Sequence, residues 1–182
     1  LKAAGRFLKP TGSLAMSIDC PSSGGEGCPR KVVCHADGTV RAICGDRPKM
    51  CGDLDLVKED IAILELDRRV LAVALAEALA LTPPARTPPM TPVIRIGARD
   101  IHAGSDIPVF LTIPGARPNL RREDFKEVLA LAPPILVLTP GTASLPEEMA
   151  DLLDRNGVTT LALDELVIAT APGKFALTAQ GT

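Results

Sequence analysis

CPRKVVCHADGTVRAIC, residues 28–44, predicts a β-hairpin in the N-terminal part of the chain. Two β-prone runs flank the pair Asp37-Gly38. An Asp-Gly pair is typical of a two-residue type I′ turn, because both central positions of that turn need a positive φ. In the resulting register Lys31 faces Cys44, which places Cys44 near the open end of the hairpin.

Cysteines lie in two pairs on either side of this hairpin. Cys34 is not part of these pairs. It lies about three residues along the strand from the level of Cys44, which is about 10 Å at about 3.3 Å per residue. This is too far for the two residues to share a metal whose Zn–S bonds are about 2.3 Å long. His35 is excluded by the same distance. The arrangement predicts a structural zinc site with four protein ligands, Cys20, Cys28, Cys44 and Cys51.

The spacing within each cysteine pair is longer than in most zinc knuckles. Gly24, Gly25 and Gly27 in one loop and Gly45 in the other would let backbone N–H groups approach a thiolate. Buried free thiols and disulfides remain alternative interpretations. Disulfides fit less well, because the number of cysteines is odd and residues 1–14 do not form an apolar secretory segment. Residues 18–56 resemble a zinc ribbon in general layout, and a site filled by four protein ligands implies a structural metal.

Composition limits the range of functions. The chain has 182 residues, 46% of them hydrophobic, which suits one large or two small domains. With a net charge of −2 and no Trp or Tyr, only a local basic patch would attract nucleic acid. The longest apolar stretch, residues 70–81, contains Glu77 and is too short to span a bilayer. We therefore expect a cytoplasmic protein with no membrane partner.

A proline-dense segment, residues 82–92, predicts a linker. Before this linker, Asp67 is a candidate N-cap for a helix over residues 68–81. The apolar face of this helix needs a partner, which is the hairpin, the following domain or a second copy of the chain. Residues 54–66 are ambiguous, because Leu54 and Leu56 alternate as in a strand whereas residues 58–62 are compatible with a short helical turn before Ile63 and Leu66. The expected division is a zinc-ribbon-like module with a C-terminal bridging helix (1–81), a Pro-rich linker (82–92) and a small α/β domain (93–182).

Strand and helix patterns alternate after the linker. Strands are predicted over 93–96, 109–113, 135–138 and 159–163, helices over 119–131 and 144–155, and a last edge strand over 174–178. Asn119 and the capping box from Ser144 to Glu147 would begin the helices, and Gly157 would end the second. The pattern predicts a parallel sheet in a Rossmann-like or flavodoxin-like layered α/β fold.

Ligands of such folds lie beyond the carboxyl ends of the strands. The loop that opens the second helix is small and rich in hydroxyl groups, so it is a candidate anion site or an ordinary strand-to-helix turn. Arg121 and Arg122 are expected on the same rim. The candidate ligand-binding residues are Thr139, Gly141, Thr142, Ser144 and Arg117.

Three functions follow from these features. The leading hypothesis is a non-catalytic regulatory or adaptor protein with structural Zn²⁺, which binds a protein partner or a second copy of itself and, as a further candidate, DNA or other nucleic acid. Five basic residues surround the hairpin: Arg30, Lys31, Arg41, Arg47 and Lys49. Nearby acidic residues nearly cancel their charge. The second hypothesis is a sensor of a small anionic ligand. The third is an enzyme that uses Asp164, Glu165 or His102.

Overall fold

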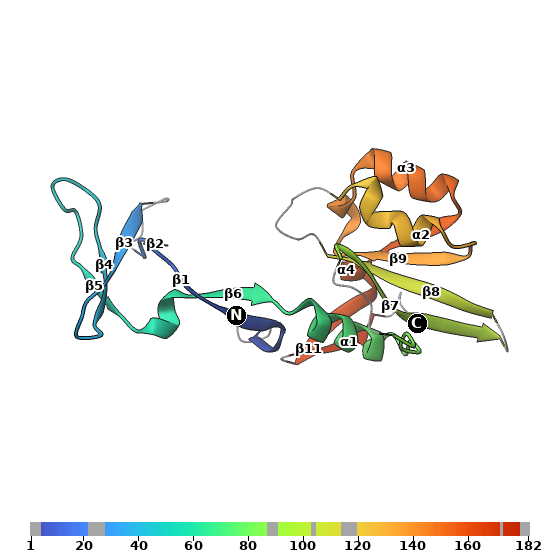
Figure 1. Ribbon diagram of the computed structural model, residues 1–182, viewed down its shortest axis with the longest axis horizontal. Helices are drawn as coiled ribbons and strands as arrows, with labels where there is room; N and C mark the ends of the chain where they lie inside the picture. The colour runs from blue at the N-terminus through green and yellow to red at the C-terminus, as the bar shows by residue number, and fades with distance from the viewer. Residues whose placement is uncertain are drawn as a thin grey trace. The chain divides into compact units, whose positions relative to one another are not determined.

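The computed structural model describes residues 5–21, 28–86, 91–102, 105–113, 120–171 and 173–178, and it divides into two compact units. Leu8–Leu66 forms the N-terminal unit. Asp67–Thr182, together with Leu1–Phe7, forms the C-terminal unit. Each unit contains sheets, and the described helices are few and short (Figure 1). The predicted mixed α/β class is confirmed.

The N-terminal unit contains a four-stranded antiparallel sheet in the order β2-β3-β4-β5 (Figure 1). The strands are β2 (Ser17–Asp19), β3 (Pro29–Cys34), β4 (Val40–Ile43) and β5 (Leu54–Leu56). A 3₁₀ turn, η2 (Lys58–Ile61), follows β5, and β6 (Ala62–Leu66) then pairs antiparallel with β1 (Leu8–Leu14). Residues 54–66, which the sequence left ambiguous, thus contain a strand, a helical turn and a second strand.

The β3–β4 hairpin forms, but its predicted register is wrong by one residue. Lys31 pairs with Ile43, and the His35 N–H donates to the Thr39 carbonyl oxygen at 2.8 Å, which leaves a three-residue loop. Only Gly38 in this loop has a positive φ, of 87°. A type I turn followed by a left-handed glycine closes the strands with one such residue, whereas a type I′ turn needs two.

Asp37 stabilises this loop with its side chain. Its Oδ1 accepts hydrogen bonds from the Thr39 N–H at 2.9 Å and from the Thr39 hydroxyl at 2.7 Å. Both bonds favour the ionised carboxylate, so the pKa of Asp37 lies below its ordinary value.

The N-terminal unit buries few side chains. Both strands of the β1–β6 ribbon are largely exposed. A unit of this size with so small an apolar core commonly needs a metal or disulfides to fold stably. The buried residues among those described in this unit are Cys20, Arg30, Val40, Ala42, Cys44 and Ile61.

The C-terminal unit is built on a four-stranded sheet in the order β10-β9-β8-β7. Strands β8 (Ser105–Thr112), β9 (Ile135–Thr139) and β10 (Val158–Ala162) are parallel, as predicted. β7 (Val93–His102) forms an antiparallel hairpin with β8, so the predicted parallel sheet holds for β8, β9 and β10. The order of the described strands does not reverse, so the sheet lacks the switch point of doubly wound folds.

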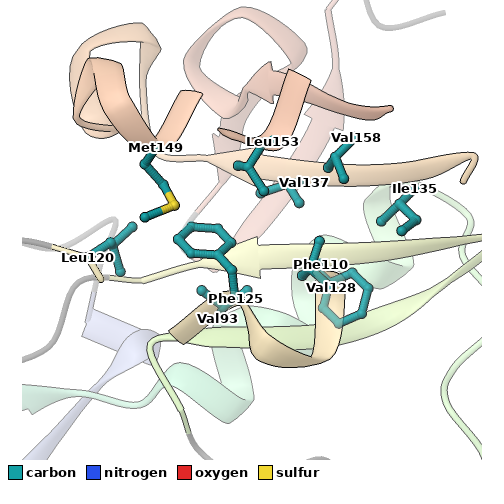
Figure 2. Close-up of a cluster of buried hydrophobic side chains, with 10 residues drawn as sticks. All are labelled: Val93, Phe110, Leu120, Phe125, Val128, Ile135, Val137, Met149, Leu153 and Val158. Atoms are coloured by element: carbon teal, nitrogen blue, oxygen red, sulfur yellow. The ribbon is translucent and has the colours of Figure 1, made fainter. Parts of the chain in front are cut away.

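One face of the sheet is covered by η3 (Arg122–Phe125), α2 (Lys126–Leu129) and α3 (Glu147–Arg155) (Figure 1). Figure 2 shows Phe125 and Met149 packed against the sheet beside Val137. Both crossover connections use this face, because residues of α2 and α3 belong to the same buried cluster. Phe110 points into this cluster and its neighbours Val109 and Leu111 point into the cluster on the other face, as strand geometry requires.

The other face is covered by α1 (Arg68–Ala78), α4 (Leu163–Leu166) and the hairpin of β11 (Val167–Ala171) and β12 (Lys174–Leu177). Leu75 and Leu79 pack on Ile94 and Ile96 of β7 in this cluster. The residues predicted as a last edge strand form β12, which pairs with β11 and not with the central sheet.

The helix boundaries agree in part with the prediction. The Asp67 N-cap is confirmed, because its Oδ1 accepts from the backbone N–H of Arg69 and Val70 at 3.1 and 3.2 Å. The capping box at Ser144 is wrong, because its hydroxyl accepts instead from the Gly141 N–H at 2.9 Å and α3 begins at Glu147. Gly157 has φ of 70° and ends α3 as expected. The predicted cap Asn119 lies outside the described residues.

Helix α1 packs on the sheet of the C-terminal unit. This sheet belongs to the domain that follows the helix in the chain, which is one of the three partners that the sequence left open. The boundary between compact units thus falls after Leu66, and not at the predicted position after residue 81.

The ends of the proline-dense segment also pair with the sheet. Thr82 and Ala98 exchange two backbone hydrogen bonds of 2.9 Å, and the Ile113 N–H donates to Pro92 at 2.7 Å. Residues 87–90 lie outside the described part.

Candidate metal centre

The four predicted ligands gather at one end of the β2–β5 sheet. The Cys20 N–H donates to the Cys28 carbonyl oxygen at 3.0 Å, which continues the β2–β3 pairing by one step. Cys44 follows β4, and Cys51 precedes β5. The loops between the antiparallel strands therefore deliver four thiols to one place, which we call the cysteine cluster.

The Cys51 sulfur atom contacts two other sulfur atoms of the cysteine cluster. The Sγ atoms of Cys20 and Cys51 are 3.7 Å apart, and those of Cys51 and Cys44 are 3.5 Å apart. A disulfide would need about 2.05 Å. Two thiolates on one tetrahedral zinc, with Zn–S bonds of about 2.3 Å, are about 3.8 Å apart. The observed spacing suits a shared metal and not a disulfide.

Cys28 approaches the cluster through Asp46. Its Sγ lies 3.7 Å from Asp46 Oδ2, and the same oxygen lies 3.6 Å from Cys44 Sγ. The ligand atoms of these three residues all lie within 4.8 Å of one another. Cys44 thus belongs to both halves of the cluster. Asp46 is one of the acidic residues near the hairpin that were expected to nearly cancel the basic patch. Its position two residues after Cys44 is the signal in the sequence that marks it as a further oxygen donor.

Arg30 is the second residue whose role the sequence analysis missed. Its side chain is buried, with 1% of its surface exposed, and not part of a surface patch. One guanidinium nitrogen, Nη2, donates to Cys20 Sγ at 3.2 Å, and Nη1 donates to the Gly52 carbonyl oxygen at 2.7 Å. The bond to Cys20 raises the pKa of Arg30 above its ordinary value. A permanent positive charge therefore faces the cysteine cluster.

Two of the four remaining basic side chains of the predicted patch are paired with acids. Arg41 Nε lies 2.9 Å from Asp55, and Lys49 Nζ lies 3.1 Å from Asp53. Among the residues that the structure describes here, only Lys31 and Arg47 are exposed cations of that patch without an ion pair. This is a weak footprint for nucleic acid.

The thiols of the cluster differ in acidity. The Asp46 N–H donates to Cys44 and lowers the pKa of its thiol. The hydrogen bond to Cys44, together with burial, raises the pKa of Cys51 to about 11. Burial and the Asp46 carboxylate raise the pKa of Cys28. In the absence of a metal the cluster therefore holds protons, which a bound metal would displace.

Cys34 lies exposed on β3, opposite Val40 and apart from the contacts of the cluster. The backbone of the adjacent His35 closes the hairpin loop. Neither residue contacts the four predicted ligands among the described interactions. Cys34 is therefore the thiol that a metal would leave available for reagents.

The second predicted site lies in the C-terminal unit, at the carboxyl end of β9. A cavity of about 800 Å³ brings Ser144 together with Arg121 and Arg122. Glu148 also lines this cavity, and Asp164 lies against Gly141 so closely that a Cβ on Gly141 would be 3.0 Å from its carboxylate oxygen. The two carboxylates reduce the attraction for an anion.

The other residues predicted for this site have different surroundings. Thr139 is buried and its hydroxyl donates to the Gly141 carbonyl oxygen at 3.1 Å, whereas Thr142 is exposed. Arg117 lies outside the described residues. The turn is therefore held together by its own hydrogen bonds.

The candidate catalytic residues do not converge in the described part of the chain. Asp164 and Glu165 are exposed on α4. His102 is the last residue of β7, where its backbone pairs with Ser105.

Searches of family models, curated proteins and solved structures found no match to this chain. Within the described residues, no helix has the length and apolar character needed to cross a membrane.

Proposed function

We propose that this protein is a non-catalytic regulatory or adaptor protein whose N-terminal unit is a zinc-ribbon-like module held by a structural Zn²⁺. The observation that carries this proposal is the contact of Cys51 Sγ with the sulfur atoms of Cys20 and Cys44, together with the position of Cys28 Sγ within 4.8 Å of Cys44 Sγ. Four thiolates fill a tetrahedral zinc and leave no position for a reacting water, which favours a structural role.

The small core of the N-terminal unit supports the same proposal. A metal that binds only the folded state adds its binding free energy to folding, and this compensates for little apolar burial. Around the module, Met16 and Met50 are 84% and 78% exposed. Flexible, exposed methionines suit binding to protein surfaces, so we propose a protein or a second copy of the chain as partner and nucleic acid only as a weaker candidate.

A sensor of a small anionic ligand is the second candidate function. Its support is the cavity that joins Arg121, Arg122 and Ser144 beyond β9. We propose that the C-terminal unit is a layered α/β domain related to Rossmann-like folds through its three parallel strands and crossover helices. The antiparallel β7 and the unreversed strand order are departures from that arrangement.

The decisive experiment measures zinc and reactive thiols in the purified, reduced chain. We expect one zinc per chain and a single thiol, Cys34, that reacts with a disulfide reagent under native conditions. The Cys20→Ser variant should lose stoichiometric zinc, whereas the matched control Cys34→Ser should keep zinc and lose the reactive thiol. A protein without metal and with all five thiols reactive would contradict the proposal.

A further inference from the structure

Two identical tripeptides lie in the connection between β4 and β5. Cys44-Gly45-Asp46 and Cys51-Gly52-Asp53 have the same sequence, and the cysteine of each belongs to the cysteine cluster. Their aspartates differ in the structure. Asp53 accepts a hydrogen bond from Lys49 Nζ at 3.1 Å, whereas Asp46 Oδ2 lies 3.6 Å from the Cys44 sulfur atom. The fold therefore places the carboxylate of the first tripeptide against the cluster.

The position of Asp46 fits an oxygen ligand of the same metal. Its Oδ2 is 3.6 Å from Cys44 Sγ and 3.7 Å from Cys28 Sγ. An oxygen and a sulfur on one tetrahedral zinc are about 3.6 Å apart, given bonds of about 2.1 and about 2.3 Å. The ligand atoms of all three residues lie within 4.8 Å of one another. A zinc bound to Cys28 and Cys44 would thus be within reach of Asp46 as well.

Cys28 is the thiol of the cluster that Asp46 is placed to replace. Cys28 Sγ lies 3.8 and 3.7 Å from the two Asp46 carboxylate oxygens, and Cys28 is partly exposed. Cys20 and Cys44 are buried, and the Cys51 sulfur atom contacts the sulfur atoms of both. Three thiols therefore form one compact set, while Cys28 and Asp46 lie side by side next to Cys44.

A tetrahedral zinc takes four ligands, so four thiolates and a carboxylate offer one donor too many. We propose that Cys20, Cys44 and Cys51 hold the zinc throughout, and that Asp46 takes the fourth position when Cys28 leaves it. One Zn–S bond breaks and one Zn–O bond forms, so the zinc stays bound while Cys28 is released. One singly negative ligand replaces another, so the positive charge of Arg30 beside Cys20 is offset equally in both forms. This inference rests on the proposed zinc site and adds an exchangeable ligand to it.

The zinc content of the purified, reduced chain and of two single variants tests the exchange. We expect Cys28→Ala to retain one zinc per chain through Asp46, and Cys20→Ala to lose stoichiometric zinc. Alanine is the replacement because its side chain offers no ligand atom. If the native chain binds zinc and Cys28→Ala loses it, the inference is overturned while the proposed structural zinc stands. A native chain without zinc would overturn both.

The repeated tripeptide provides a matched control for the carboxylate. Cys28→Ala combined with Asp46→Ala should lose stoichiometric zinc. Cys28→Ala combined with Asp53→Ala should retain it, because Asp53 forms its ion pair with Lys49. Equal behaviour of the two double variants, whether both retain zinc or both lose it, would overturn the assignment of Asp46 as the replacing ligand.

Cobalt in place of zinc reports the ligands directly, because thiolate-to-Co²⁺ charge-transfer absorption increases with the number of bound thiolates. Co²⁺-loaded Cys28→Ala should keep the d–d bands of a tetrahedral site, with the charge-transfer absorption reduced by the loss of one thiolate in four. Asp46→Ala in the otherwise native chain should match the native spectrum, since four thiolates remain. Loss of the tetrahedral d–d bands in Cys28→Ala would show that Asp46 does not complete the site. Unchanged charge-transfer absorption in Cys28→Ala would show that Cys28 is not a ligand, and either result overturns the inference.

Discussion

The guanidinium of Arg30 is buried beside Cys20, and burying a cation is unfavourable unless anionic partners compensate for the lost hydration. Four thiolates on one Zn²⁺ carry a net charge of −2, so the proposed zinc-bound cluster would provide those partners. The guanidinium in turn offsets part of the repulsion among the thiolates. Arg30 therefore has the position and charge of an outer-shell residue that tunes the metal.

Replacing Arg30 tests this role. Arg30→Met keeps much of the apolar volume and removes the charge, so we expect zinc affinity to fall about 10- to 100-fold, as for other outer-shell partners. Competition with a chromophoric chelator measures the affinity. Arg41→Met, which removes an exposed arginine paired with Asp55, is the control and should bind zinc as the native chain does. Equal affinities of the two variants would exclude an outer-shell role for Arg30.

Asp46 adds a second residue-level feature to the cluster. Its carboxylate lies between Cys28 and Cys44. Burial raises the pKa of Cys28 and the Asp46 carboxylate raises it further, while the backbone N–H of Asp46 lowers the pKa of Cys44. Asp46 therefore contributes to the difference in acidity between two neighbouring thiols. The order in which these thiols give up protons to a metal follows from that difference.

At the scale of elements, the close approach of β7 to the segment after α1 depends on Gly97. A Cβ at Gly97 would lie 2.7 Å from the Thr82 carbonyl oxygen and 2.8 Å from Leu81 Cβ, which are clashing distances. The absence of a side chain therefore lets Thr82 pair with Ala98. The same contact holds Leu81 and Pro83 in place beside α1.

Gly97→Ala should destabilise the C-terminal unit by about 1–3 kcal/mol, the usual effect of overpacking, because the backbone at Thr82 has to shift. Chemical denaturation followed by circular dichroism measures the free energy of unfolding. Gly5→Ala is the matched control, since a Cβ at Gly5 meets no atom within 4 Å, and it should change stability little. Equal stabilities of the two variants would show that β7 and this segment separate without loss.

At the scale of the whole molecule, the two units differ in what holds them together. The C-terminal unit buries apolar clusters on both faces of its sheet. In the N-terminal unit, two of the few buried residues are cysteines of the cluster and a third is Arg30. Stability of the N-terminal unit should therefore depend on metal, and stability of the C-terminal unit should not.

Chelation of zinc tests this difference. We expect EDTA to remove hydrogen-exchange protection from β2, β3, β4 and β5 and to leave β8, β9 and β10 protected. Adding zinc back should restore protection of the first sheet. Simultaneous loss of protection in both sheets would show that the units unfold as one, and full protection of both would show that the metal contributes nothing to folding.

Features that depend on residues near one another in the chain could be predicted from the sequence. The Asp67 cap, the helical turn before β6, the parallel strands β8 to β10 and the left-handed Gly157 all follow from local hydrogen bonding or from the period of apolar residues. The grouping of four cysteines followed from the hairpin, although the hairpin register itself was wrong by one residue. A one-residue difference in loop length decides that register, and Asp-Gly is compatible with both loops.

By itself, the sequence determined the elements and the cysteine pairs, because periodicity and capping act over a few residues. Only the tertiary structure decided that Arg30 is buried on Cys20, that Asp46 joins the cluster, that β7 pairs antiparallel and that α1 covers the C-terminal sheet. These outcomes depend on which surfaces meet across long separations in the chain. A charged or apolar side chain has many acceptable partners, and the packing of the whole unit selects among them.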